Sequence, residues 1–504
     1  MDERKVTPHA PEQKPPVPWT RRETLALVWA LGLSWVWFQV YWEGLNAGMP
    51  ALGVTVFEWL FLLGGALCLR AHRPVPPGVK LLLTAAALTA LTCALHSVWW
   101  LNLLNAVISM ALGLMGLFAL TGRTAPWDTI AAVGESFRLT MRGLFRYFTL
   151  PFRSIPRRKH RETPRSRRAQ GIALGVLAAV VLLVIVVPLL ASADAIFNQL
   201  TEHAINGLAG WLRETFRFST LPGALGRVLR WAVLGLVLFS LLKSLRDADR
   251  AEGNFRFPEA VPGAAVPVTV VLAALNAVYA VFVFIQFAYL FGGVETAAMA
   301  GGFAEYARSG FFQLVKVSAV NLITLLLAVR LLPEKGGAVA RGLGIVLVVF
   351  TGVLLVSAAY RMGLYISVYG LSVKRLLTLW AMAVIAVSMV LAAVKLVVRP
   401  FRLYRWLFLA GLILWLALSA MNIHAVVAEY NVDAYLDGRM EELDAGYLGS
   451  LGYGAAPALN KLAAAYGEPG VDWQTWDFYM DHALNHYTAN WRTWDAYSAW
   501  YYLR

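Results

Sequence analysis

Five side chains between residues 361 and 375 have the types and the spacing to bind an anion. Arg361, Tyr365 and Tyr369 stand at positions i, i+4 and i+8, so a single helix would carry them on one face. Lys374 and Arg375 come shortly after them, and ammonium and guanidinium groups bind phosphate and carboxylate. The pattern favours a cationic pocket with an aromatic rim, suited to a lipid phosphate or a carboxylate.

A structural role explains the same stretch without a ligand. Gly370 suits the left-handed residue that ends many helices, and the Ser372 hydroxyl can cap the helix that follows. The stretch would then be a tight helix hairpin with tyrosines at the membrane surface. Both interpretations, the pocket and the hairpin, stay open on the sequence.

Two ionisable residues fall inside apolar segments, where a charged group is costly and often functional. Glu58 and Lys316 lie at similar depth from the outer end of their segments, so they could form a buried pair. In the alternative, Lys316 extends its ammonium group to the membrane surface and no pair forms.

Uncharged amides also fall within or beside apolar segments. Because a buried amide needs a partner, we expect them to form hydrogen bonds between helices; together with Tyr279 and Tyr289 they could instead line a polar pathway. These amides are Asn102, Asn105, Asn276, Gln286 and Asn321.

Motifs for metal binding and catalysis are weak. His482 and His486 stand at i, i+4 and could share a metal ion, but the glutamate of an HExxH zinc site is missing. A P-loop, a CxxC pair and a GxSxG motif are all lacking. One SxxK match, Ser240 to Lys243, lacks the motifs that accompany it in penicillin-binding proteins. We therefore expect no cofactor and no metal, with His482 and His486 as weak metal candidates, and the sequence favours a non-enzymatic protein over an enzyme.

The elements that hold these residues are apolar helices. Hydrophobic residues make up 59% of the 504 residues and charged residues only 15%, against roughly 25% charged in soluble proteins. This composition excludes a soluble enzyme and a disordered chain, and predicts an all-α, polytopic integral membrane helix bundle. Eleven spans are expected, near 24–42, 51–70, 80–100, 102–121, 170–192, 224–243, 267–291, 310–332, 342–360, 376–398 and 403–421.

The net charge of +14 could suggest a nucleic-acid partner, but most of the basic residues fall in segments expected on one side of the membrane. With the N-terminus inside, the segments on the inner side hold 31 of the 44 Lys and Arg residues. The bias predicts a membrane protein with a cytoplasmic N-terminus and an extracytoplasmic C-terminus, and argues against a nucleic-acid partner.

The chain divides into five expected regions. These are a disordered leader (1–20), a four-helix membrane region (21–121), a basic cytoplasmic loop (122–169), a seven-helix membrane core (170–421) and an aromatic-rich extracytoplasmic tail (422–504). Within the tail, residues 423–436 and 456–466 are predicted to be helical.

The basic loop has the pattern of a helix that lies on a membrane surface. Arg138, Arg142 and Arg146 follow at i, i+4 spacing opposite an apolar face, and a basic run that includes Arg157 and Arg158 comes next. We expect these residues to contact anionic lipids at the cytoplasmic face. The alternative is a plain topology determinant.

Two sequence runs resemble a known family. The first is Tyr-Arg-Met-x-Leu-Tyr from Tyr360 with Tyr-Gly-Leu-Ser from Tyr369, and the second runs from Asn422 to Leu459 and includes Ala-Glu-Tyr-Asn-Val-Asp from Ala428. They resemble a bacterial membrane family known as the domain of unknown function four-one-seven-three, over roughly residues 170–465. The resemblance implies a multi-pass protein of the bacterial cytoplasmic (inner) membrane and supplies no activity or catalytic residue.

Three functions follow from these features. The first is a non-enzymatic envelope scaffold, sensor or assembly partner that binds another membrane protein. The second is a carrier or flippase for an anionic or amphiphilic substrate, with Arg361, Lys374 and Arg375 as its outer gate and Glu58 and Lys316 within. The third is a membrane-embedded lipid-modifying enzyme with an outward-facing site.

Overall fold

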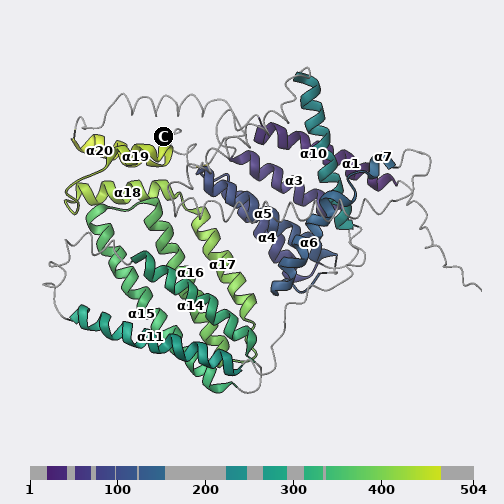
Figure 1. The fold of residues 1–504 in the computed structure, drawn as a ribbon. Coiled ribbons are helices and arrows are strands. Elements are labelled where there is room, and N and C mark those ends of the chain that lie inside the picture. Colours follow the sequence, from purple (N-terminus) through teal and green to yellow (C-terminus); the bar gives the residue numbers. More distant parts are fainter. Residues whose placement is uncertain are drawn as a thin grey trace, which may run out of the picture. The chain divides into compact units, whose positions relative to one another are not determined.

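The protein is all-helical throughout the part that the structure describes. The computed structural model describes residues 20–42, 51–69, 75–96, 98–121, 124–153, 223–246, 265–291, 311–332, 337–466 and 496. Within these residues there is no strand (Figure 1). Nine of the described helices are long and apolar enough to cross a membrane, as in a multi-pass membrane protein.

Nine is fewer than the eleven spans predicted, and the two missing segments are accounted for differently. The segment predicted at 80–100 is a shorter apolar helix, α4 (Pro77–Thr92), and the chain turns before the next helix begins at Trp99. The segment predicted at 170–192 lies outside the described residues, as do Arg157, Arg158 and the tail histidines His482 and His486.

One span is longer than predicted. The apolar run suggested residues 342–360, but α15 extends over Ala338–Tyr369. The apolar run ends at Arg361, but the helix continues for two more turns. It stops at Gly370, whose φ of +71° lies in the left-handed region that favours glycine.

The described helices belong to two compact units, residues 1–35 with 139–247 and residues 36–138 with 248–504. In the first unit, α1 (Arg21–Trp37) runs antiparallel to α10 (Gly223–Arg246). The Ser34 hydroxyl donates to the carbonyl of Trp231 at 2.7 Å, and the Trp231 indole donates to the carbonyl of Leu31 at 2.8 Å. These bonds pair polar groups that would otherwise be unsatisfied between apolar helices.

A buried ion pair joins the other ends of the same two helices. Lys243 Nζ lies 2.5 Å from Glu23 Oε1, and the two side chains are 6% and 4% exposed. The other Glu23 oxygen accepts from the backbone amide of Thr20 at 2.7 Å, so the acid also closes the start of α1. Lys243 is therefore the partner of Glu23, and Ser240 donates instead to the carbonyl of Gly143. The SxxK match is thus part of the packing.

In the second unit, three helices that come early in the sequence pack against one another. They are α3 (Leu52–Leu69), α4 and α5 (Trp99–Leu120). Gly116 lets α5 approach α4, because a Cβ there would lie 2.9 Å from the Leu83 side chain.

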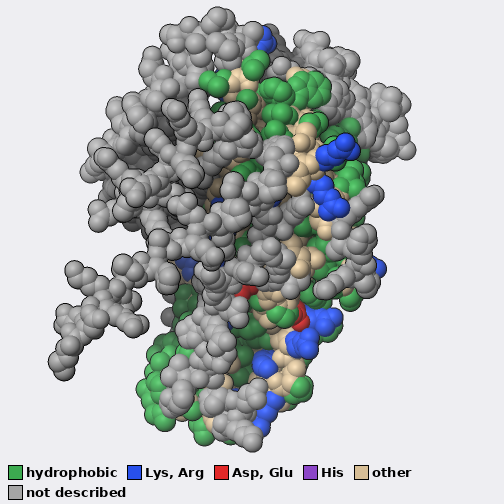
Figure 2. All heavy atoms as spheres, turned by 90° about the vertical axis from the view of Figure 1, so that its right-hand side faces the viewer, with side chains coloured by type: hydrophobic (Ala, Val, Ile, Leu, Met, Phe, Trp, Pro, Cys, Tyr) green, Lys and Arg blue, Asp and Glu red, His purple; other side chains and the backbone are tan. Residues whose placement is uncertain are grey.

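Five long helices form the core of the second unit. Their inner faces share one hydrophobic cluster that includes Leu347, Leu354 and Ala358 of α15. Their outer faces expose valines such as Val266 and Val356, which are 71% and 70% exposed and suit contact with lipid. Hydrophobic side chains also make up much of the described surface visible in Figure 2. The five helices are α11 (Ala265–Phe291), α14 (Phe311–Leu331), α15, α16 (Val373–Val397) and α17 (Leu403–Ala420).

A short helical layer follows α17 and covers one end of the core (Figure 1). Its helices α18 and α20 coincide with the two predicted at 423–436 and 456–466. Val427 and Val432 of α18 belong to the same buried cluster as the spans. We call this layer the cap and this end of the second unit the capped end. The cap comprises α18 (Ile423–Leu436), α19 (Ala445–Ser450), η3 (Gly452–Ala455) and α20 (Ala456–Tyr466).

Removing one partner of the buried ion pair should destabilise the protein. We expect Glu23→Gln to lower the free energy of unfolding by about 3 kcal/mol, since it leaves the Lys243 charge buried and unpaired. Combining Glu23→Gln with Lys243→Met should recover part of the loss. Thermal unfolding in detergent of the single and double variants measures both effects, and simply additive losses would contradict the pairing.

Candidate functional site

The turn between α15 and α16 is fastened to the cap. The Asn431 side chain of α18 accepts from the backbone amide of Leu371 at 2.6 Å and donates to its carbonyl at 2.8 Å. The Tyr447 hydroxyl of α19 accepts from the backbone amide of Val373 at 3.0 Å. Two cap side chains therefore satisfy the polar backbone of a turn that has no secondary structure of its own.

Arg375 closes the same turn from within. Its guanidinium donates to the carbonyl of Tyr369 at 2.8 Å and to that of Gly370, and it lies 4.2 Å from the centre of the Tyr365 ring. The Tyr365 and Tyr369 rings are 5.0 Å apart. Arg375 thus satisfies carbonyls that the end of α15 leaves open, and stacks on an aromatic face.

This geometry favours the hairpin over the anion pocket. Ser372 caps α16 as expected, by accepting from the amide of Arg375 at 3.4 Å. Tyr365, Tyr369 and Arg375 come together, but as parts of the turn. Lys374 is exposed and Arg361 is half-buried. Their role in ligand binding remains a prediction.

Glu58 and Lys316 do not pair in the structure. Glu58 is 2% exposed and lies among α3, α4 and α5, with Glu58 Oε2 3.3 Å from Ser109 Oγ. Lys316 on α14 is exposed, so the surface-seeking alternative for the lysine fits better. The similar depth of Glu58 and Lys316 in their spans could not predict whether they pair, because the neighbours of a span depend on the tertiary structure.

A row of buried polar groups extends from Glu58 toward the capped end. Asn102, Asn105 and Ser109 stand at i, i+3 and i+7 on one face of α5, and each is at most 4% exposed. Asn105 Oδ1 accepts from the Trp415 indole at 2.9 Å and from the Ser419 hydroxyl at 2.8 Å, which ties α5 to α17. We call Glu58, Ser109, Asn105, Asn102 and His96 the polar row.

His96 ends the polar row in the loop between α4 and α5. Its Nε2 atom lies 2.7 Å from the carbonyl of Ser419, so Nε2 carries the proton and Nδ1 is left as an acceptor. Asn102 Nδ2 donates to the carbonyl of His96 at 2.8 Å. Three buried atoms of the row have no hydrogen-bond partner among the described residues: His96 Nδ1, Asn102 Oδ1 and Asn105 Nδ2. Ordered water would satisfy such groups.

Asn276 and Asn321 form hydrogen bonds between helices, as the interhelical interpretation predicted, and the side chain of Gln286 lies outside the described residues. Asn276 Nδ2 donates to the carbonyl of Leu343 at 2.8 Å. Asn321 accepts from the Tyr279 hydroxyl at 2.7 Å and donates to Thr351 at 3.0 Å. These bonds connect α11, α14 and α15.

The predicted lipid-facing arginines are only partly described. Arg142 and Arg146 are exposed on α6 (Ile130–Arg146), and Arg138 is half-buried. Val133 and Phe137 of the same helix are 53% and 57% exposed, so its apolar side is not covered by the described protein. Contact with anionic lipid remains a prediction. No group of three or more His, Cys, Asp or Glu residues suited to a metal occurs within the described part of the chain.

Comparison with known proteins gives a family and no activity. The sequence profile of the family described as "Domain of unknown function (DUF4153)" matches residues 83–462. The chain belongs to this family. A family of unknown function was expected from the motifs, although its number is 4153 where they suggested 4173. The match begins well before residue 170, so it includes most of α4 and all of α5. No curated protein and no solved structure matches the chain.

Several residues of this site were missed in the sequence, although signals for some were present. Asn431 lies in the second run that carried the family resemblance, and its spacing gives no hint of the turn it binds. His96 stands within a segment predicted as a span, which hid its position in a loop. Lys243 was considered only as the end of the SxxK match, whereas the capping pattern Thr20-x-x-Glu23 could have drawn attention to its partner.

Replacing Asn431 should weaken the attachment of the cap. We expect Asn431→Ala to lower the free energy of unfolding by about 2 kcal/mol, because the buried amide and carbonyl of Leu371 both lose their partner. Lys461→Ala removes an exposed ion pair with Asp433 and serves as the control, with little expected effect. Thermal unfolding with limited proteolysis of the cap measures the change. Equal stability of Asn431→Ala and the control would contradict the attachment.

The cap should loosen in acid through His424. Burial lowers the pKa of His424 below its ordinary value of 6.5, and its Nδ1 donates to the carbonyl of Leu451 at 2.9 Å. The unfolded chain therefore takes up a proton at a higher pH than the folded chain does. Stability should be constant above about pH 7.5 and fall as the pH drops through about 6.5.

The matched measurement is thermal unfolding across this pH range for the native protein and for His424→Gln. The glutamine variant should lose part of the slope below about pH 6.5. An unchanged slope would show that other groups cause it.

Proposed function

We propose that this multi-pass membrane protein is a carrier for an anionic or amphiphilic substrate, and that Glu58 binds and releases the proton that accompanies transport. The observation that carries the proposal is the burial of Glu58 within the span region. It is 2% exposed on a helix that is apolar enough to cross a membrane. Burying a carboxyl group there costs folding free energy, so its presence suggests a function.

The surroundings of Glu58 suit a group that exchanges a proton. None of the ion pairs among the described residues includes Glu58, so no cation offsets an ionised carboxylate. A buried carboxyl without a counter-charge is cheaper to keep in its neutral form. A change in local hydration would then shift its proton binding, which is the property that coupled transport needs.

Ser109 supports the same view through its single hydroxyl proton. Ser109 Oγ lies 2.9 Å from the carbonyl of Ala86 and 3.3 Å from Glu58 Oε2. The hydroxyl can donate to one of the two at a time, and the carbonyl is closer. A proton on Glu58 would let the acid donate to Ser109 and satisfy all three groups at once.

The polar row supports a route between Glu58 and the capped end. Its unpaired atoms, His96 Nδ1, Asn102 Oδ1 and Asn105 Nδ2, are acceptors and donors that water can bridge. A chain of waters along one face of α5 would connect the loop at His96 with Ser109 and Glu58. Protons would then reach Glu58 from the capped end.

A second candidate, an envelope scaffold or assembly partner, is favoured by the cap. The bonds of Asn431 and Tyr447 attach a folded helical layer to the ends of the spans. Such a layer can present a fixed surface to another membrane protein. It gives no use for Glu58, which is why the carrier is the leading proposal.

Glu58→Gln should abolish coupled transport and leave the fold intact. Proteoliposomes on a solid-supported membrane would be exposed to jumps of organic carboxylates and alkyl phosphates. We expect at least one to give a transient current that depends on pH and that disappears in Glu58→Gln. Glu135→Gln is the control, because Glu135 is also a buried acid but accepts from the backbone amide of Ala125 at 2.7 Å.

Infrared spectroscopy gives a test that needs no substrate. The native protein should show a protonated-carboxyl band that responds to deuterium, is lost in Glu58→Gln and persists in Glu135→Gln. No current from any compound, together with a membrane protein cross-linked to the cap, would overturn the carrier in favour of the scaffold.

A further inference from the structure

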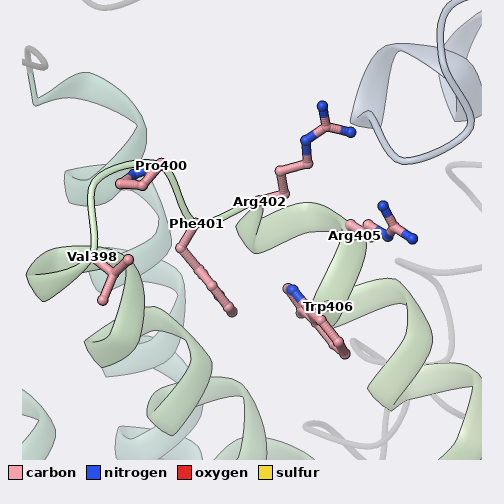
Figure 3. A pocket seen from close by; sticks show the side chains of 6 residues that line it. All are labelled: Val398, Pro400, Phe401, Arg402, Arg405 and Trp406. Atoms are coloured by element: carbon pink, nitrogen blue, oxygen red, sulfur yellow. The ribbon is translucent and has the colours of Figure 1, made fainter.

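An open hollow of about 440 Å³ lies where α16 gives way to α17, at the other end of α16 from the cap (Figure 3). Its volume falls within the roughly 300–1,000 Å³ of small-molecule sites. We call it the linker hollow. It is lined by Val398, Pro400, Phe401, Arg402, Arg405 and Trp406.

The sequence around the linker hollow is strongly basic. Residues 395–405 include four basic residues and no acid. Lys395 is used locally, because its ammonium group donates to the carbonyl of Arg399 at 2.6 Å. Arg402 and Arg405 stand at the start of α17, where a cation opposes the helix dipole. Helix stability therefore does not explain why these two arginines are there.

Both arginines keep donors available for a ligand. Arg402 is 72% exposed in its side chain, and its one described bond is a 3.3 Å contact with Asp128. The Arg405 guanidinium lies 5.7 Å from the centre of the Trp127 ring, which orients it without occupying its N–H groups. Each guanidinium has five N–H donors in a planar fork that matches a phosphate.

The opposite side of the linker hollow is aromatic. The Phe401 and Trp406 rings are nearly parallel, with an angle of 6° and centres 6.3 Å apart. Figure 3 shows both rings pointing away from the Arg402 guanidinium. Trp406 and Val398 are 48% and 44% exposed, so the apolar wall is open to the surroundings. The hollow thus has a cationic side and an apolar side at the end of two membrane-crossing helices.

We propose that the linker hollow binds an anionic glycerophospholipid. The lipid phosphate lies against Arg402 and Arg405, and the glycerol and first acyl carbons lie against Phe401 and Trp406. A soluble anion would use the arginines and leave the exposed rings without a partner, whereas a lipid uses both sides. A second, smaller hollow of about 50 Å³ lies at the same end and is lined in part by Arg341, Lys395 and Arg399, which do not line the linker hollow.

Native mass spectrometry of the full-length protein tests this site. The protein in neutral detergent would be titrated with phosphatidylglycerol, phosphatidylcholine or inorganic phosphate. We expect one phosphatidylglycerol to be retained in preference to phosphatidylcholine. Arg402→Gln combined with Arg405→Gln should weaken retention at least about tenfold, since two charge-assisted contacts are lost.

Matched variants separate a specific site from general attraction. Arg399→Gln removes one charge from the same linker outside the hollow and should leave retention unchanged. Trp406→Leu should weaken phosphatidylglycerol binding through the apolar wall alone. If the double variant fails to fold, Arg405→Gln alone is compared with Arg399→Gln, which carries the same charge change.

Two results would overturn the proposal. An equal loss in Arg399→Gln would show that retention reflects diffuse charge. Displacement of the lipid by inorganic phosphate at the same concentration would show that a soluble anion is the occupant. Neither result depends on Glu58, so the lipid site and the carrier can fail separately.

Discussion

The constraint on which this structure depends is that polar groups within or beside apolar helices must find partners inside the protein. In hydrocarbon, water is not available to satisfy a backbone amide or a side-chain amide. Burial in protein has the same effect at the α15–α16 turn, where Gly370 and Leu371 are buried. There Arg375, Asn431 and Tyr447 bind backbone groups between residues 369 and 373. The cap is thus part of what makes a tight turn possible.

The same constraint shows how the polar row differs from other buried polar groups. Most buried polar groups of the second unit find a protein partner, as Asn321 does with Tyr279 and Thr351. The row differs, since His96, Asn102 and Asn105 each keep an unpaired atom within the described part of the chain. Incomplete satisfaction is costly in a structural network but useful where water or a proton must pass. The amides that join α11, α14 and α15 leave one such atom, Asn276 Oδ1, whereas the row has three of them along one face of α5 and in the loop before it.

The sequence predicted what depends on local composition. The all-helical class, most spans and the helices at 423–436 and 456–466 follow from apolar runs and helical periodicity. It did not predict what depends on which helices become neighbours. The pair of Glu58 with Lys316 on α14 was one of two possibilities, and Glu58 lies instead beside Ser109 on α5. Lys243 is buried against Glu23, which is more than two hundred residues away in the sequence. Depth along a span can be counted from a sequence, but the rotation and partners of that span cannot.

Helix α15 is long enough to extend from one end of the core to the other. Its 32 residues span about 48 Å at 1.5 Å per residue, which exceeds a hydrocarbon thickness of about 30 Å. The helix must therefore tilt or extend beyond the hydrocarbon. The residues of its last turns, Arg361, Tyr365 and Tyr369, are types that prefer the membrane interface, which favours extension at the capped end. The depth of the helix is then limited at one end by these residues and, if a lipid occupies the linker hollow, at the other by its phosphate. Such limits would also fix the depth of Glu58 relative to the two membrane surfaces, because α4 and α5 pack against α17.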